Sequence, residues 1–164
     1  MLEIMLAQPR GFCAGVTRAI DVVSLALQRF GPPVYVFHEI VHNQHVVNDL
    51  RERGAVFVDD INDIPTGSVT IFSAHGVSKA VVDAAGRRHL ESIDATCPLV
   101  TKVHLQAQRF HARGYHLVMI GHAGHEEVEG TIGSVDGPVH LVGTREDVKH
   151  LPWSQDSPVA YVTQ

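Results

Sequence analysis

Short apolar runs alternate along this chain with longer segments whose apolar residues recur every three or four positions. A short apolar run between turn residues is typical of a buried strand, and the longer spacing is typical of an amphipathic helix. The runs predict strands at residues 2–7, 34–37, 55–58, 69–72, 116–120, 139–142 and 159–162. The longer spacing predicts helices at residues 16–30, 44–53, 78–88, 98–113, 126–132 and 145–150.

This alternation predicts an α/β protein built on parallel sheets, because parallel neighbouring strands need a crossover connection, usually a helix. Asn43 is suited to cap the second helix, and Gly54 to end it. The pattern restarts after residue 94. We therefore expect two small α/β domains, residues 1–95 and 96–164, and leave open whether the second is complete.

Composition narrows the class of protein. The 164 residues are 45% hydrophobic and 19% charged, which favours a packed core over disorder. A net charge of -5 disfavours nucleic acid as a partner, although a small phosphorylated ligand needs only a few local donors. No apolar stretch is long enough to span a bilayer and no basic leader is visible, so we expect a cytoplasmic protein with no membrane partner. In the cytoplasm, two cysteines are more typical of free thiols or metal ligands than of a disulfide.

Chemically active side chains follow the predicted strands. Ligands of open parallel sheets bind beyond the carboxyl ends of the strands. Both cysteines and three of the 12 histidines stand there, namely Cys13, Cys97, His42, His75 and His125. Each cysteine precedes a helix, whose positive end stabilises a thiolate and suits it to bind a metal. The histidines and helix N-termini are suitable donors to phosphate.

Other interpretations of these residues stay open. Free cysteines are often buried and inert, and a histidine can simply donate to a core carbonyl. Glu126, Glu127 and Glu129 open a predicted helix and can complement its dipole, or one of them can act as a proton donor. Spacing does not choose between Glu126 and Glu127. The chain has no Walker A, G-x-G-x-x-G or C-x-x-C pattern, which disfavours a nucleotide, dinucleotide or zinc-ribbon site.

Five long motifs resemble one family in order and spacing. They are PRGFCAGVTRAI (9–20), HEIVHNQHVV (38–47), FSAHGVS (72–78), DATCPLVTKVH (94–104) and IGHAGHEEVEGT (120–131). Together they are similar to the LytB/IspH family of 4-hydroxy-3-methylbut-2-enyl diphosphate reductases. The resemblance implies three small α/β domains around a [4Fe-4S] cluster. It implies reductive dehydroxylation of the substrate to isopentenyl and dimethylallyl diphosphates, the last step of the methylerythritol phosphate route to isoprenoids.

The resemblance also implies roles for individual residues. Cys13 and Cys97 match two of the three cluster cysteines. His42, His75 and His125 match the residues that bind the diphosphate. Glu127 matches the acid of the proton relay and is favoured over Glu126, because family members can carry proline at the latter position. The implied electron donor is ferredoxin or flavodoxin.

The third cluster cysteine of the family and its Ser-x-Asn motif have no counterpart in these 164 residues. We therefore expect an incomplete cluster ligand set and a fragment that is inactive by itself. Two alternatives remain. One is a zinc module held by Cys13, Cys97 and two histidines. The other is an anion-binding α/β domain without redox activity.

Overall fold

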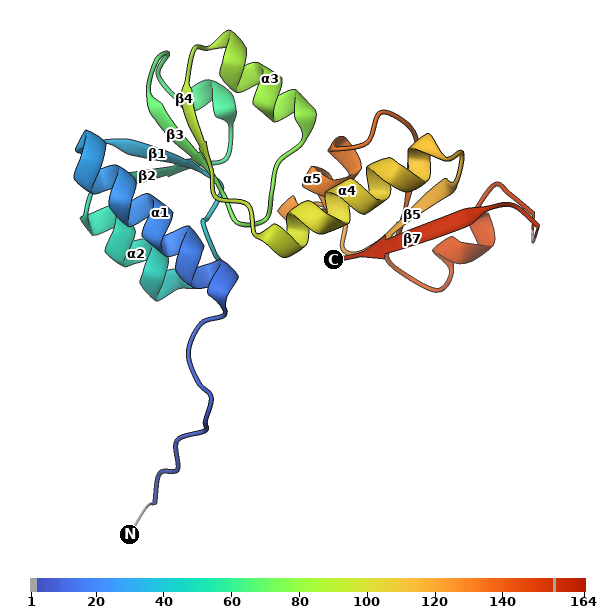
Figure 1. Cartoon of the computed structure of the whole chain (residues 1–164), viewed down its shortest axis with the longest axis horizontal. Coiled ribbons are helices and arrows are strands. Elements are labelled where there is room, and N and C mark those ends of the chain that lie inside the picture. Colours follow the sequence, from blue (N-terminus) through green and yellow to red (C-terminus); the bar gives the residue numbers. More distant parts are fainter. Residues whose placement is uncertain (1–2, 155) are drawn as a thin grey trace.

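Two parallel β-sheets, each packed against helices, form the chain in the computed structural model, which describes residues 3–154 and 156–164 (Figure 1). The first sheet has the strand order β2-β1-β3-β4 and the second the order β6-β5-β7. The strands of the first sheet are β1 Val34–Phe37, β2 Ala55–Val58, β3 Val69–Phe72 and β4 Glu91–Asp94. Those of the second are β5 His116–Ile120, β6 Val139–Val142 and β7 Val159–Thr163. The predicted fold class, small parallel-sheet α/β units, is confirmed.

Helices connect the strands, as parallel pairing requires. They are α1 Ala14–Phe30, α2 Gln44–Glu52, α3 Lys79–Arg87, α4 Pro98–Ala112 and α5 Glu126–Gly133, with 3-10 turns at Ile61–Asp63 and Asp147–His150. In Figure 1, α1 and α2 lie on one face of the first sheet and α3 on the other. Within the described residues, no helix combines the length and apolar character needed to cross a bilayer.

The first sheet is buried on both faces. Along β1, Val34 and Val36 point into the core beneath α1 and α2. Tyr35 and Phe37 point the opposite way, into a second core beside α3. Successive side chains of a strand alternate between faces, so a run that is apolar throughout fits a sheet covered on both sides. This explains why the apolar runs located β1, β2 and β3 at their observed bounds.

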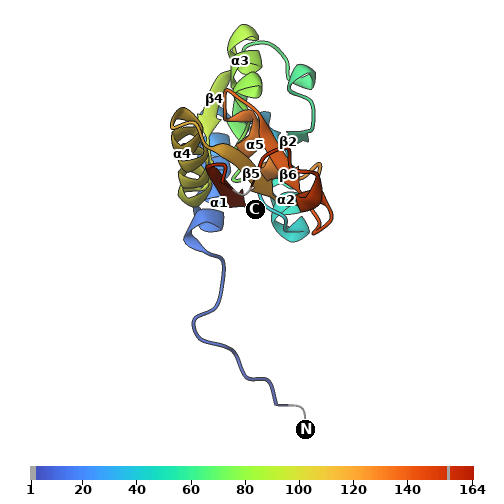
Figure 2. The ribbon, with the colours of Figure 1, turned by 90° about the vertical axis from the view of Figure 1, so that its right-hand side faces the viewer.

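One predicted strand is wrong. Residues 3–7 form no strand, and Ile4 and Met5 are 77% and 87% exposed; Leu2 lies outside the described residues. The segment leads away from both sheets in two perpendicular views (Figures 1 and 2). An apolar run becomes a strand only where a neighbouring strand pairs with its backbone. Cys13 consequently follows an extended segment, whereas the expectation placed it after a strand.

Two smaller differences concern polar segments. β4 begins at Glu91 and ends at Asp94, and the apolar pattern did not predict it because it is an edge strand with exposed charged ends. The predicted helix at residues 145–150 is a single 3-10 turn, Asp147–His150. The division at residue 95 stays a prediction, although the chain there leaves the first sheet and enters α4.

Candidate functional site

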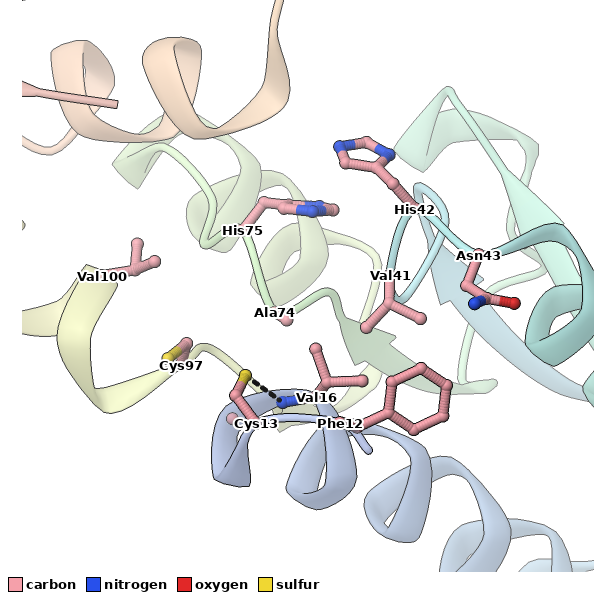
Figure 3. A pocket seen from close by; sticks show the side chains of 11 residues that line it. Phe12, Cys13, Val16, Val41, His42, Asn43, Ala74, His75, Cys97 and Val100 are labelled. Atoms are coloured by element: carbon pink, nitrogen blue, oxygen red, sulfur yellow. Dashed lines mark hydrogen bonds between the residues drawn. The ribbon is translucent and has the colours of Figure 1, made fainter. Parts of the chain in front are cut away.

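A cavity of about 400 Å³ lies where the loops after β1, β3 and β4 meet the start of α1. Its lining contains both cysteines and two of the candidate histidines, Cys13, Cys97, His42 and His75, among apolar side chains (Figure 3). His42, His75 and Cys97 each follow the carboxyl end of a parallel strand, as the topology predicts for a binding site. Four residues far apart in the sequence therefore face one space.

The two thiols share a helix-terminal setting. Cys13 caps α1, and its Sγ accepts a hydrogen bond from the backbone N–H of Val16 at 3.5 Å. Cys97 occupies the N-cap position of α4 without a capping hydrogen bond from its side chain, and its backbone N–H donates to the carbonyl of Ala74 at 3.0 Å. Helix N-termini present a partial positive charge, which stabilises anionic sulfur and its bonds to metals.

Gly15 leaves open the space that the sulfurs face. A Cβ atom at Gly15 would lie 2.8 Å from the Sγ of Cys97 and 3.8 Å from the Sγ of Cys13. Arg18, one turn further along α1, donates to the carbonyl of Thr96 at 2.9 Å and so ties the Cys97 loop to the same helix. The fold thus holds two exposed or half-exposed thiols beside one unfilled volume.

Three imidazoles form a cluster beside the thiols. The rings of His42 and His75 stack at 4.3 Å between centroids, and the ring of His125 lies 5.3 Å from the first and 5.8 Å from the second. His125 caps α5, and its Nδ1 accepts the N–H of Glu127 at 3.1 Å. In the neutral ring the proton is then on Nε2, which donates to the Nε2 of His42 at 3.3 Å.

His75 is neutral at pH 7. Burial above all, and then the neighbouring His42 and His125, lower the pKa of His75 to about 4, while Glu126 opposes the shift. The Oγ of the fully buried Ser73 lies 3.4 Å from His75 Nδ1. A hydroxyl can donate or accept, so Ser73 can support either tautomer of the ring.

Glu126 is the carboxylate that faces the histidines. Its Oε2 lies 3.8 Å from the Nε2 of His42. Burial alone would raise the pKa of Glu126, but its own backbone N–H and the nearby His75 and His42 lower that pKa below its usual range. An ionised carboxylate therefore stands beside the imidazoles.

The structure brings some predicted residues together and leaves one aside. Cys13, Cys97, His42 and His75 line the cavity, and His125 reaches it through its contact with His42. Glu127 is half-buried in the first turn of α5 and is not part of the lining. The sequence analysis missed the support that Ser73 offers, although Ser73 falls inside one of the quoted motifs.

Two glycines explain how α5 reaches the first sheet. A Cβ at Gly130 would lie 2.9 Å from the carbonyl oxygen of Gly76, and one at Gly133 would lie 2.2 Å from the Cβ of Ser78. The helix therefore rests directly on the backbone that follows His75. Glycine permits such close approach because it has no side chain. This contact sets the position of His125 against the other two rings.

Fold and site together define a parallel-sheet α/β protein with a cavity lined by two thiols and paired imidazoles. Comparison with known proteins identifies the family of this chain. The family model described as LytB protein matches residues 4–164, and the chain belongs to the LytB family.

Curated relatives and solved structures agree with this family assignment. The chain is 58% identical over 164 residues to 4-hydroxy-3-methylbut-2-enyl diphosphate reductase of Zymomonas mobilis, covering 100% of this chain and 48% of the relative. It is 59% identical over 162 residues to the reductase of Azoarcus sp., covering 99% and 52%. The solved structure of the E-1-hydroxy-2-methyl-but-2-enyl-4-diphosphate reductase from Plasmodium falciparum superposes with a TM-score of 0.91 at 44% identity, covering 96% of this chain and 49% of that one. The chain spans about half the length of the curated relatives it matches.

Proposed function

We propose that this chain supplies two cluster thiolates and the diphosphate-binding histidines of a reductase that converts 4-hydroxy-3-methylbut-2-enyl diphosphate to isopentenyl and dimethylallyl diphosphates. The observation that carries the proposal is the convergence of Cys13, Cys97, His42 and His75 on one cavity. The names of the relatives support the reaction and the substrate.

The two sulfurs fit an iron–sulfur cluster. Clusters are held by thiolates, and both sulfurs border the volume that Gly15 leaves open. When bound, the cluster supplies electrons and an iron that acts as a Lewis acid. Two thiolates do not complete a ligand set, so the remaining ligand must come from outside these two cysteines. Ferredoxin or flavodoxin is the proposed electron donor.

The imidazoles would bind and orient the diphosphate. If the hydroxyl of Ser73 donates to His75 Nδ1, the His75 ring presents its Nε2–H to an anion. The Nε2 atoms of His42 and His125 lie 3.3 Å apart. A phosphate that displaces the hydrogen bond between them can accept the Nε2–H of His125 and, once the proton of His42 is on its Nε2, that N–H as well. Fixing the anion there places the substrate with its other end toward the sulfurs.

Glu127 is the proposed proton donor, on the strength of its match to the family motif. Its backbone N–H is bonded to the ring of His125, which joins the start of α5 to the imidazole cluster. A carboxyl group so placed can hold a proton close to a substrate bound by the histidines.

Diphosphate binding is the direct test of the site. Inorganic diphosphate is titrated calorimetrically against the chain, its His75→Ala variant and, as a matched control, its His45→Ala variant, since His45 is exposed on α2. We expect His75→Ala to weaken binding at least about tenfold, the equivalent of one charge-assisted hydrogen bond of ~1.5 kcal/mol. Equal affinity in all three proteins would reject the diphosphate site. We expect Cys13→Ser and Cys97→Ser to leave diphosphate binding intact, because the anion would contact imidazoles and not thiols.

Cluster chemistry is tested separately. After anaerobic reconstitution, we expect less iron and weaker broad visible absorbance than an intact cluster would give, because the ligand set is incomplete. Both cysteine substitutions are expected to abolish this uptake. With reduced methyl viologen, the isolated chain is expected to show no turnover, because its ligand set is incomplete. A colourless protein that takes up zinc at the cysteines would instead favour a zinc module, and full turnover would refute the expected dependence on a further ligand.

A further inference from the structure

Helix α4 and the residues that follow it carry basic side chains and no acidic ones. Residues 95–125 contain Lys102, Arg109 and Arg113 but no aspartate or glutamate, although the chain as a whole has 18 acidic and 13 basic residues. All three basic residues are exposed, and none of the ion pairs among the described residues involves them. Their positive charge is therefore not neutralised by a carboxylate within ion-pair distance.

Two exposed leucines lie on the same side of α4 as these charges. Leu99 and Leu105 are 67% and 44% exposed. Successive helix positions turn by about 100°, so positions 99, 102, 105 and 109 fall within one sector of about 120°, opposite the buried Ala107. Apolar side chains with charged ones around them are the arrangement found in protein–protein interfaces. We call this surface the α4 face; it consists of Leu99, Lys102, Leu105 and Arg109.

The α4 face begins beside the two thiols. Cys97 occupies the N-cap position of α4, and Leu99 lies in the first turn of that helix. Helix α1 begins next to it, because a Cβ at Gly15 would lie close to the sulfurs of both Cys97 and Cys13. Figure 1 shows the starts of α1 and α4 near each other. A protein bound to the α4 face would therefore lie next to the sulfurs.

We propose that the α4 face binds an acidic electron-donor protein, an inference that rests on the proposed function because only a reductase needs such a partner. Complementary charge speeds the encounter of two proteins, and redox partners use small, short-lived interfaces. The donor is oxidised by one electron in each encounter. Two encounters supply the two electrons that, with two protons, exchange the C–O bond of the substrate for a C–H bond and release water.

Charge distinguishes this partner from the other occupants of an exposed helix face. Nucleic acid is disfavoured, because the face offers two cations on a chain whose net charge is -5. A second copy of the chain is also disfavoured. A two-fold dimer places the same patch of both copies in contact, so Lys102 and Arg109 would face cations of the other copy. An acidic protein meets neither objection.

Binding of an oxidised plant-type [2Fe–2S] ferredoxin, an acidic one-electron carrier, tests the proposal. It is titrated calorimetrically into the chain at about 20 mM NaCl, where surface charges are weakly screened. Lys102→Glu and Arg109→Glu are each expected to weaken binding at least about fivefold, because each turns an attraction into a repulsion. Arg87→Glu makes the same charge change at an exposed position in the last turn of α3 and is expected to weaken binding less than about twofold. Raising NaCl to about 300 mM is expected to weaken binding at least about tenfold.

NMR spectra of the ¹⁵N-labelled chain locate the bound ferredoxin. We expect its amide shifts to be confined to α4 and the start of α1, and Leu105→Ser, which removes an exposed apolar side chain, to weaken binding at least about threefold. No binding at low salt, affinity that neither charge reversal changes, or shifts centred elsewhere would overturn the proposal. A dimer in light scattering that Lys102→Glu dissociates would overturn it in favour of a second copy. Diphosphate affinity is expected to be unchanged in these variants, so a failure of the α4 face is distinct from a failure of the proposed function.

Discussion

Gly130 lies where α5 meets the backbone that follows His75. Replacing it with alanine has two opposing effects on the free energy of unfolding. A Cβ there would lie 2.9 Å from the oxygen and 3.1 Å from the carbon of the Gly76 carbonyl, and 3.3 Å from the nitrogen of Val77. All three neighbours are backbone atoms, so relief requires the helix or the loop to move. Overpacking of this kind costs about 1–3 kcal/mol.

Alanine also favours the helix over glycine, by about 1 kcal/mol. The expected net result for Gly130→Ala is therefore a loss of roughly 0–2 kcal/mol in the free energy of unfolding. Gly86 provides the control, because it is a helical glycine of α3 with nothing within 4 Å of an added Cβ. Gly86→Ala is expected to gain up to about 1 kcal/mol.

Urea unfolding followed by circular dichroism, together with a thermal melt, measures both variants against the parent chain. The difference between them is expected to be about 1–3 kcal/mol, or roughly 2–12 °C in Tm for a chain of this size. Because the contact positions α5, Gly130→Ala is also expected to weaken diphosphate binding, whereas Gly86→Ala is not. If Gly130→Ala proved as stabilising as Gly86→Ala, the close contact of α5 with the loop would be wrong.

Three further predictions concern single residues. In the metal-free chain, NMR titration of His75 is expected to give a midpoint of about 4. Because the unfolded ring titrates near 6.5, the stability contributed by the neutral ring is present above pH 6.5 and is lost as the pH falls toward 4. A midpoint near 6.5 would contradict the half-buried position of the ring. The Oδ1 of Asn43 caps α2 by accepting the N–H of Val46, and Asn43→Ala is expected to lower the free energy of unfolding by about 1 kcal/mol in a urea melt. An unchanged free energy would show that this cap does not stabilise the helix. Gly15→Ala is expected to displace the Sγ of Cys97, 2.8 Å from the new Cβ, and to reduce iron uptake with little change in Tm, because a thiol can rotate away; unchanged uptake would argue against this space holding a cluster.

The apolar pattern predicted most of the secondary structure because burial and periodicity agree in these segments. β1 is apolar throughout, β3 is apolar except for the buried Thr70, and both are covered on both faces, so their bounds follow from the local pattern. Residues 3–7 carry the same apolar signal but have no neighbouring strand, and β4 pairs with β3 although its ends are charged. Pairing depends on what lies alongside a segment, and a local pattern does not contain that information.

The candidate site, too, was predicted in part from the sequence and decided in part by the tertiary structure. Motif and topology predicted that Cys13, Cys97, His42, His75 and His125 would gather at one edge of the sheets. The first four line the cavity, and His125 contacts His42. The motif comparison favoured Glu127 over Glu126, yet the carboxylate that faces His42 is that of Glu126. Adjacent helix positions point about 100° apart, so the choice between neighbours depends on how the helix is rotated against its partner.

By itself the sequence determined the alternation of strands and helices, the parallel connections between them and the family to which the chain belongs, because these follow from local spacing and from long motifs. Only the tertiary structure decided which side chains meet. The approach of His125 and Glu126 to the stacked rings of His42 and His75 depends on α5 resting on the backbone after His75. That contact joins segments about 55 residues apart, and it exists because glycine lets two backbones approach more closely than any side chain would allow.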